Sequence, residues 1–266
     1  MEELLLIQIP QFRPEYHPDK TYGYQNKKEK ANLTAVLEKS TGGYCMYCFS
    51  RIRVDQKLCA NLEHAIEKTQ SEQLMECIPD IGIACLTCNQ SWKRFGEKKR
   101  KLPREIIQYF EHQCECSADN RKQCKTPCKA LRELQEIYTS QKDAQMLLQP
   151  MGIKGSDTGQ DLAMQYNILT MEFEPAIDQY DYSDKELHFI DLHIKRFHLN
   201  DPKYRSKELF NFVKIVIDQG GKMPVYENNN LIAELFRKKL SGATPEEILK
   251  ICENIYKITF LRMQGI

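Results

Sequence analysis

The sequence predicts an α+β fold made of a zinc-stapled first part, residues 1–149, and a mostly helical second part, residues 150–266. Two CxxC pairs predict the first part, because a CxxC turn delivers two thiolates from one backbone bend and two such turns complete a tetrahedral zinc site. Apolar residues at helical spacing, between capping signals, predict the second part. The expected ligands of this structural zinc are Cys45, Cys48, Cys85 and Cys88.

The composition indicates an ordinary soluble globular chain. Of its 266 residues, 41% are hydrophobic and 28% charged, and a net charge of +1 excludes a global basic field that would attract nucleic acid. No run of about 18 apolar residues is present, and the start of the chain lacks the basic segment and cleavage site of a signal peptide. We therefore expect a cytoplasmic protein with no membrane span, whose cysteines stay reduced.

The elements expected before the second CxxC pair follow from caps and apolar spacing. Residues 1–28 mix prolines and tyrosines without a clear period, which indicates an irregular arm. A helix is expected from Glu29 to the two glycines at 42–43. The segment 44–54 is expected to be a zinc knuckle that enters a hairpin strand, and 61–66 is expected to be the second strand.

After the second CxxC pair, residues 86–94 are expected to start a helix with Asn89 in its first turn. Glycines and a proline at 150–161 indicate a linker or surface loop, and alternating apolar residues at 164–173 indicate a strand or hairpin. Further helices are expected at 131–148, 184–197, 204–218 and 244–262.

An acidic residue followed by histidine, Glu63-His64, lies between the two cysteine pairs, and Asn89 directly follows the last cysteine. This arrangement resembles the HNH, or ββα-metal, endonucleases that carry a CxxC…CxxC zinc in a treble-clef-like core. The resemblance implies that Glu63 and Asn89 bind a catalytic Mg²⁺ or Mn²⁺ together with the scissile DNA phosphate. It also implies that neutral His64 accepts a proton from the attacking water, and Lys68 matches a lysine that commonly follows this histidine.

The sequence departs from the family pattern at two positions besides the choice of Glu over Asp at position 63. Asp80 replaces the middle asparagine, and Lys93 stands one position later than the usual lysine. Asp80 could accept a hydrogen bond from the imidazole of His64 and so belongs to the candidate catalytic group. Its negative charge should raise the pKa of His64.

A run of cations follows the second CxxC pair. Such a run is ordinarily a solvated helix face, whereas next to a nuclease site it can contact DNA phosphates. The candidate nucleic-acid-binding residues are Lys68, Lys93, Arg94, Lys98, Lys99 and Arg100.

A second group of cysteines lies beyond the cationic run, with His112 as a substitute ligand. The spacings CxC and CxxxC are less stereotyped than CxxC, so the group is either a second structural zinc site or a set of exposed thiols on a polar loop. Its members are Cys114, Cys116, Cys124 and Cys128.

The lead-in to the first knuckle, residues 41–48, and a helix break at Leu199-Asn200 are similar to the PtuB-like HNH proteins of Septu and retron antiphage defence systems. That resemblance implies a PtuA-like partner ATPase of the same operon, docked on residues 150–266 in a hetero-oligomer. Two alternatives stay open at this point. One is a zinc-scaffolded module that binds nucleic acid or protein without cutting, and the other is an RNase.

Overall fold

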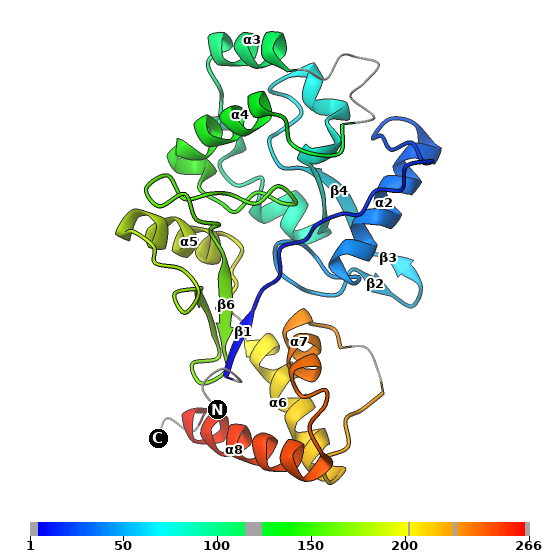
Figure 1. The fold of residues 1–266 in the computed structure, drawn as a ribbon, viewed down its shortest axis with the longest axis vertical. Coiled ribbons are helices and arrows are strands. Elements are labelled where there is room, and N and C mark those ends of the chain that lie inside the picture. The colour runs from blue at the N-terminus through cyan, green and yellow to red at the C-terminus, as the bar shows by residue number, and fades with distance from the viewer. Residues whose placement is uncertain (1–4, 115–123, 202, 226–227, 264–266) are drawn as a thin grey trace.

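The computed structural model combines helices with short antiparallel strand pairs (Figure 1). The strands are β1 (Leu6–Gln8), β2 (Arg53–Val54), β3 (Lys57–Leu58), β4 (Ala60–His64), β5 (Ile81–Cys85), β6 (Met164–Asn167) and β7 (Glu172–Pro175). The helices are α2 (Lys27–Thr41), α3 (Arg104–Gln113), α4 (Lys129–Ser140), α5 (Asp184–Arg196), α6 (Lys203–Asp218), α7 (Leu231–Lys239) and α8 (Pro245–Met263). The structure describes residues 5–114, 124–201, 203–225 and 228–263.

Helix α2 begins and ends where its sequence signals predict. The side chain of Asn26 accepts hydrogen bonds from the first free backbone N–H groups of the helix, and Gly42 ends it with a φ of 65°. Leu33 and Leu37 are fully buried on one face. This face packs against β5, so α2 covers the strand pair that leads into the second CxxC turn.

Strand β4 pairs with β5 in an antiparallel register that sets Glu63 opposite Gly82 and His64 opposite Ile81. The expectation that β4 would pair with the segment 44–54 is wrong. That segment folds back on itself as a knuckle, with Phe49 at a φ of 62°, and contributes two isolated bridges and the two-residue strand β2. The apolar stretch of β5 is buried instead and supplies the partner strand.

The helix expected at 86–94 is short. A helical segment starts at Leu86 and continues as a π-helical turn from Cys88 to Trp92, with Asn89 in its first turn. Turns and a single 3₁₀ turn, Glu97–Lys99, follow and lead to α3. Two antiparallel strands and one helical turn therefore surround the second CxxC pair.

The N-terminal arm contains a strand that the sequence pattern did not predict. Strand β1 pairs with β6, and β6 pairs with β7, which gives a three-stranded antiparallel sheet in the order β1-β6-β7. Figure 1 shows β1 beside β6 in the middle of the molecule, with α5 next to this sheet. Three residues are too few for a periodic signal, and only the partner strand reveals them.

The helices expected in the second part are present, with α6, α7 and α8 packed together at one end of the molecule (Figure 1). Thr244 and Glu247 exchange hydrogen bonds between side chain and backbone at the start of α8, which confirms the predicted cap. Helices α3 and α7 were not predicted. Of the helix expected at 131–148, the structure has α4 followed by a separate 3₁₀ turn at Lys142–Ala144.

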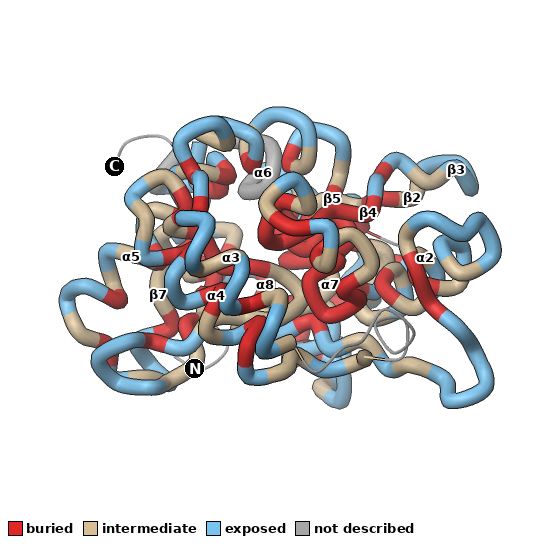
Figure 2. Tube along the Cα trace, turned by 90° about the horizontal axis from the view of Figure 1, so that it is seen from above, coloured by how far each residue is buried: buried red, intermediate tan, exposed pale blue. Residues whose placement is uncertain are grey.

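The second part also contacts the first CxxC turn directly. The backbone N–H of Arg51 donates to the carbonyl of Asn229 at 2.7 Å, and that of Leu231 donates to the carbonyl of Phe49 at 3.0 Å. Figure 2 shows buried segments running through β4, β5 and α7. Within the described ranges, no helix is both long and apolar enough to cross a membrane.

Candidate functional site

The thiols of the two CxxC pairs converge on one point, and we call Cys45, Cys48, Cys85 and Cys88 the cysteine cluster. Their ligand atoms all lie within 4.8 Å of one another. The sulfurs of Cys48 and Cys85 are 3.7 Å apart. A tetrahedral zinc with Zn–S bonds of about 2.3 Å would hold two sulfurs roughly 3.8 Å apart. The cluster could therefore hold a structural metal ion such as zinc.

Hydrogen bonds around the cluster favour thiolates at two of its members. The backbone N–H groups of Cys85 and Tyr47 point at the sulfur of Cys45, at 3.3 and 3.5 Å. Hydrogen bonds from the other thiols, that of Cys45 foremost, lower the pKa of Cys48 and of Cys85. Burial raises the pKa of Cys45 and Cys88. A metal ion would offset this cost, because thiolates are the ligating form.

The first knuckle also fixes a residue of the candidate active site. The hydroxyl of Tyr47, between Cys45 and Cys48, donates to Glu63 Oε2 at 2.7 Å. The other oxygen of Glu63 forms an ion pair with the ammonium group of Lys93, whose side chain is 5% exposed. Burial raises the pKa of Tyr47, so it remains a hydrogen-bond donor. The sequence pattern did not predict this role of Tyr47.

His64 lies at the end of β4 with a hydrogen bond that defines its tautomer. Its Nε2 is 3.1 Å from the carbonyl oxygen of Met75. Since a carbonyl only accepts, Nε2 carries the hydrogen and Nδ1 carries the lone pair. Burial, followed by the charges of Lys68, Lys93 and Lys30, lowers the pKa of His64 to about 4.

The expectation that Asp80 would raise the pKa of His64 is therefore wrong. Desolvation and nearby ammonium groups act in the other direction and dominate. Asp80 itself is fully buried, and burial raises its pKa well above the usual value. Its Oδ1 accepts a hydrogen bond from the backbone N–H of Ile66 at 2.9 Å, whereas the imidazole of His64 donates to the carbonyl of Met75. Asp80 thus fixes the backbone two residues after His64 through its hydrogen bond with Ile66.

A cavity of about 270 Å³, which we call the central cavity, opens between β4 and the helical turn after β5. Glu63, His64 and Asn89 line it together. Of the candidate nucleic-acid-binding residues, its walls include Lys68, Lys93, Arg94 and Arg100. Tyr24 and Glu67 also line it, and the sequence patterns singled out neither. No local sequence signal singles out Glu67, which lies in the loop after β4 and is identified by its contacts.

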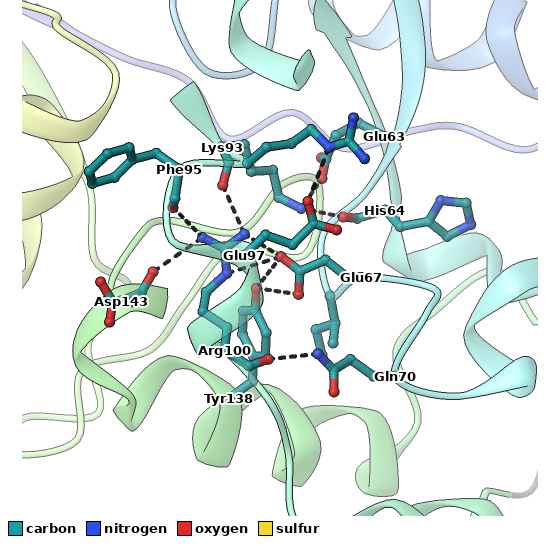
Figure 3. A network of polar contacts seen from close by, with 12 residues as sticks. Glu63, His64, Glu67, Gln70, Lys93, Phe95, Glu97, Arg100, Tyr138 and Asp143 are labelled. Carbon is teal, nitrogen blue, oxygen red and sulfur yellow. Dashed lines mark hydrogen bonds and ion pairs between the residues drawn. The ribbon is translucent and has the colours of Figure 1, made fainter. Parts of the chain in front are cut away.

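Two of the expected phosphate-binding cations are committed to partners inside the protein (Figure 3). Arg100 is fully buried and pairs with Glu67, whose carboxylate also accepts a hydrogen bond from the hydroxyl of Tyr138 at 2.7 Å. The same guanidinium donates to the carbonyl of Lys93 at 2.8 Å. Lys93 in turn donates to the carbonyl of His64. We call Lys93 and Arg100 with these partners the closed side of the cavity.

The remaining cations of the run face solvent. Arg94, Lys98 and Lys99 are exposed, and Arg94 forms an exposed ion pair with Glu97. An exposed pair of this kind contributes little stability, so it leaves Arg94 able to exchange partners. Lys98 and Lys99 lie on the 3₁₀ turn that precedes Arg100.

The proposed second zinc site falls partly outside the described residues, because Cys116 belongs to the segment 115–123. Cys114, Cys124 and Cys128 are half-buried, and the thiol of Cys124 lies 3.2 Å from the carbonyl of Thr126. Among the described cysteines, histidines and carboxylates, the cysteine cluster is the group whose ligand atoms converge. The second site stays a prediction.

Comparison of the chain with known protein families, with curated proteins and with solved structures finds no match. The cysteine cluster and the central cavity are therefore the features from which a function can be inferred.

Proposed function

We propose that this chain is a metal-dependent endonuclease of the HNH type, with its active site in the central cavity. The observation that carries the proposal is the convergence of Glu63, His64 and Asn89 on one cavity. The first two end β4, which pairs with β5, and the third belongs to the helical turn after β5, where the cysteine cluster holds Cys85 and Cys88. A scaffold that only bound a structural metal would not require a carboxylate, an imidazole and an amide at one place.

The side chains around the cavity fit a hard divalent cation such as Mg²⁺ or Mn²⁺. Carboxylate and amide oxygens are the ligands such ions prefer, and Glu63 and Asn89 supply one of each. When bound, the divalent ion would stabilise negative charge on the phosphate that reacts.

His64 is suited to accept the proton of the attacking water. A pKa of about 4 keeps its imidazole neutral near pH 7, and the hydrogen bond to Met75 leaves the Nδ1 lone pair as the basic site. Tyr47 and Lys93 hold the carboxylate of Glu63, the residue before His64 in β4, in place. A fixed base of this kind contributes about 10²- to 10⁴-fold in rate.

The test is cleavage of a supercoiled DNA plasmid by the full chain in Mg²⁺ or Mn²⁺. His64→Ala should lose about 10²- to 10⁴-fold in rate while it keeps its zinc content. Asn89→Ala should need a higher divalent metal concentration. His188→Ala, an exposed histidine on α5, is the matched control and should cut as the wild type does. Full cutting by His64→Ala would place the active site elsewhere.

A zinc-scaffolded binding module is the competing proposal, and one observation favours it. Both oxygens of Glu63 have partners within the protein, which is the state expected of a purely structural carboxylate. Absence of cleavage by the zinc-loaded wild type on DNA and on RNA, together with binding of either, would select this alternative. Cleavage of RNA alone would make the protein an RNase.

We further propose that a larger ATPase encoded beside this chain controls it, as the resemblance to defence-system proteins implies. The exposed apolar residues Ile258, Phe260 and Leu261 near the end of α8 support a docking surface in the second part. The full chain should co-purify with the ATPase from its native operon, Phe260→Asp should weaken the association, and Lys195→Asp, at an exposed position of α5, should not. Recovery of the chain alone, with vigorous cutting, would reject this partner.

A further inference from the structure

Tyr24, at the end of the N-terminal arm, carries two lysine ammonium groups beside His64. The Nζ atoms of Lys68 and Lys30 lie 4.4 and 4.6 Å from the centroid of its ring. Lys68 also donates a hydrogen bond to the Tyr24 hydroxyl at 3.1 Å. The ring meets the imidazole of His64 edge-on, with centroids 4.6 Å apart. One aromatic ring therefore positions two cations next to the candidate base.

These two lysines differ from Lys93 and Arg100 in what neutralises them. None of the ion pairs between described residues includes Lys30 or Lys68. A contact between an ammonium group and an aromatic ring is weak at an exposed site, and the two like charges repel each other. The carboxylate of Glu76 accepts hydrogen bonds from the backbone N–H groups of Tyr24 and Gln25, at 2.7 and 2.9 Å, and forms no ion pair with either lysine. The arrangement thus concentrates positive charge that no ion pair among the described residues neutralises, as an anion-binding position requires.

The position of Lys30 supports an external anion. It lies near the N-terminus of α2, where Lys27 and Lys28 add further positive charge and Glu29 is the acidic residue. The helix dipole disfavours cations at this end and favours an anion. Asn26 already accepts from the N–H groups of Lys28 and Glu29, so the lysine side chains, and not the helix amides, are left to hold an anion.

We propose that Lys30 and Lys68, positioned by Tyr24, bind a backbone phosphate of the nucleic-acid substrate directly beside His64. Tyr24 and Lys68 line the central cavity, so an anion held there lies along its wall. We call Tyr24, Lys30 and Lys68 the open side of the cavity. The ligand is a phosphodiester because the proposed nuclease function, on which this inference rests, brings one to the same cavity. Tyr24 is a positioning residue that acts through the two lysines.

The experiment measures binding of the zinc-loaded full chain to a fluorescent DNA duplex at several salt concentrations, without Mg²⁺ or Mn²⁺, so that no cleavage is needed. Lys30→Ala and Lys68→Ala should each weaken binding and reduce the slope of log affinity against log salt by about 0.9, the value for one lost phosphate contact. Lys27→Ala removes the same charge from the same helical turn and is the matched control, with a clearly smaller change expected. Tyr24→Leu removes the ring that both lysines contact and should weaken binding nearly as much as loss of both lysines. Tyr24→Phe keeps the ring, so the contribution of Lys30 to binding should remain.

Equal weakening by Lys30→Ala and Lys27→Ala would overturn the proposal, since it would mean that only net charge matters. A parallel titration with single-stranded RNA distinguishes the sources of the phosphodiester, and the same residue pattern on either polymer supports the site. Displacement of the duplex from the wild type, but not from Lys30→Ala, by inorganic phosphate would also support it. Because binding is read without cleavage, a chain that shows this pattern but never cuts rejects the nuclease and keeps the site. If the wild type cuts DNA and Lys30→Ala binds the duplex as well as the wild type, the nuclease is kept and the phosphate site is rejected.

Discussion

The cations on the two sides of the central cavity differ in burial and in ion pairing. On the closed side, Lys93 and Arg100 are buried and paired with Glu63 and Glu67. On the open side, Lys30 and Lys68 rest on an aromatic ring and share no ion pair with a described carboxylate. Removing one partner of a buried ion pair leaves the other charge buried without compensation and lowers stability. Removing an exposed cation mainly weakens the attraction of phosphate groups to the surface. The closed side should therefore control stability and the open side ligand binding.

The largest expected effect comes from the cysteine cluster, which supports both sides. Cys85→Ser should remove the zinc and with it on the order of 10 kcal/mol of folding free energy, giving insoluble or protease-sensitive protein. Elemental analysis should find at least one zinc per chain in the wild type, and near two if the second cysteine group also binds. Cys59→Ser, at an exposed lone cysteine, is the control and should keep both zinc and fold. Folded wild-type protein with less than one zinc per chain would reject the structural site.

The next effect concerns the closed side alone. Arg100→Met leaves Glu67 buried without its charge partner and should lower the free energy of unfolding by about 3–5 kcal/mol. Lys99→Met, next to it but exposed, should change it by less than about 0.5 kcal/mol. Urea denaturation of the zinc-loaded variants measures both. Combining Arg100→Met with Glu67→Gln should recover part of the loss. Equal small effects of the two single variants would remove the distinction between the sides.

A smaller effect should appear as a pH dependence of the stability next to the closed side, where Tyr47 holds Glu63. His193 in α5 packs against Tyr47 and accepts a hydrogen bond from the backbone N–H of Leu147 at 2.9 Å, and burial lowers its pKa to about 3. In the unfolded chain His193 binds a proton below about pH 6.5, whereas in the folded chain it stays neutral down to about pH 3. The free energy of unfolding is therefore highest above pH 6.5 and falls as the pH is lowered toward 3. Between pH 6.5 and 4.5 the loss should be about 2 kcal/mol.

Chemical denaturation at several pH values checks this slope. His193→Gln should flatten the dependence between pH 6.5 and 4.5, although its stability at pH 7 will be lower. His188→Gln, an exposed histidine on the same helix, should leave the slope as in the wild type. A slope that stays unchanged in His193→Gln would assign the acid sensitivity to other groups, with buried His64 the first to examine.

Local features of the sequence sufficed wherever neighbours along the chain set the geometry. The CxxC spacing predicted the cysteine cluster, and the glycine after α2 and the Thr-Pro-Glu-Glu start of α8 predicted where these helices end and begin. Such signals work because a cap or a knuckle is completed within a few residues. The proximity of Glu63 to Asn89 followed from the family pattern, and the pairing of β4 with β5 explains how the fold achieves it.

Only the tertiary structure decided which strands pair and which cations remain available. Strand β1 is ordered by β6, far along the chain, and the partner of β4 proved to be β5 and not the first knuckle. Within one cationic run, Arg100 is buried and Lys99 exposed, because Glu67 and Tyr138 come from distant elements to meet the guanidinium. Tyr24 joins the cavity in the same way. The sequence determines the charges and the cysteines that could hold a metal ion, whereas long-range packing determines which charges are neutralised inside and which stay without an ion pair.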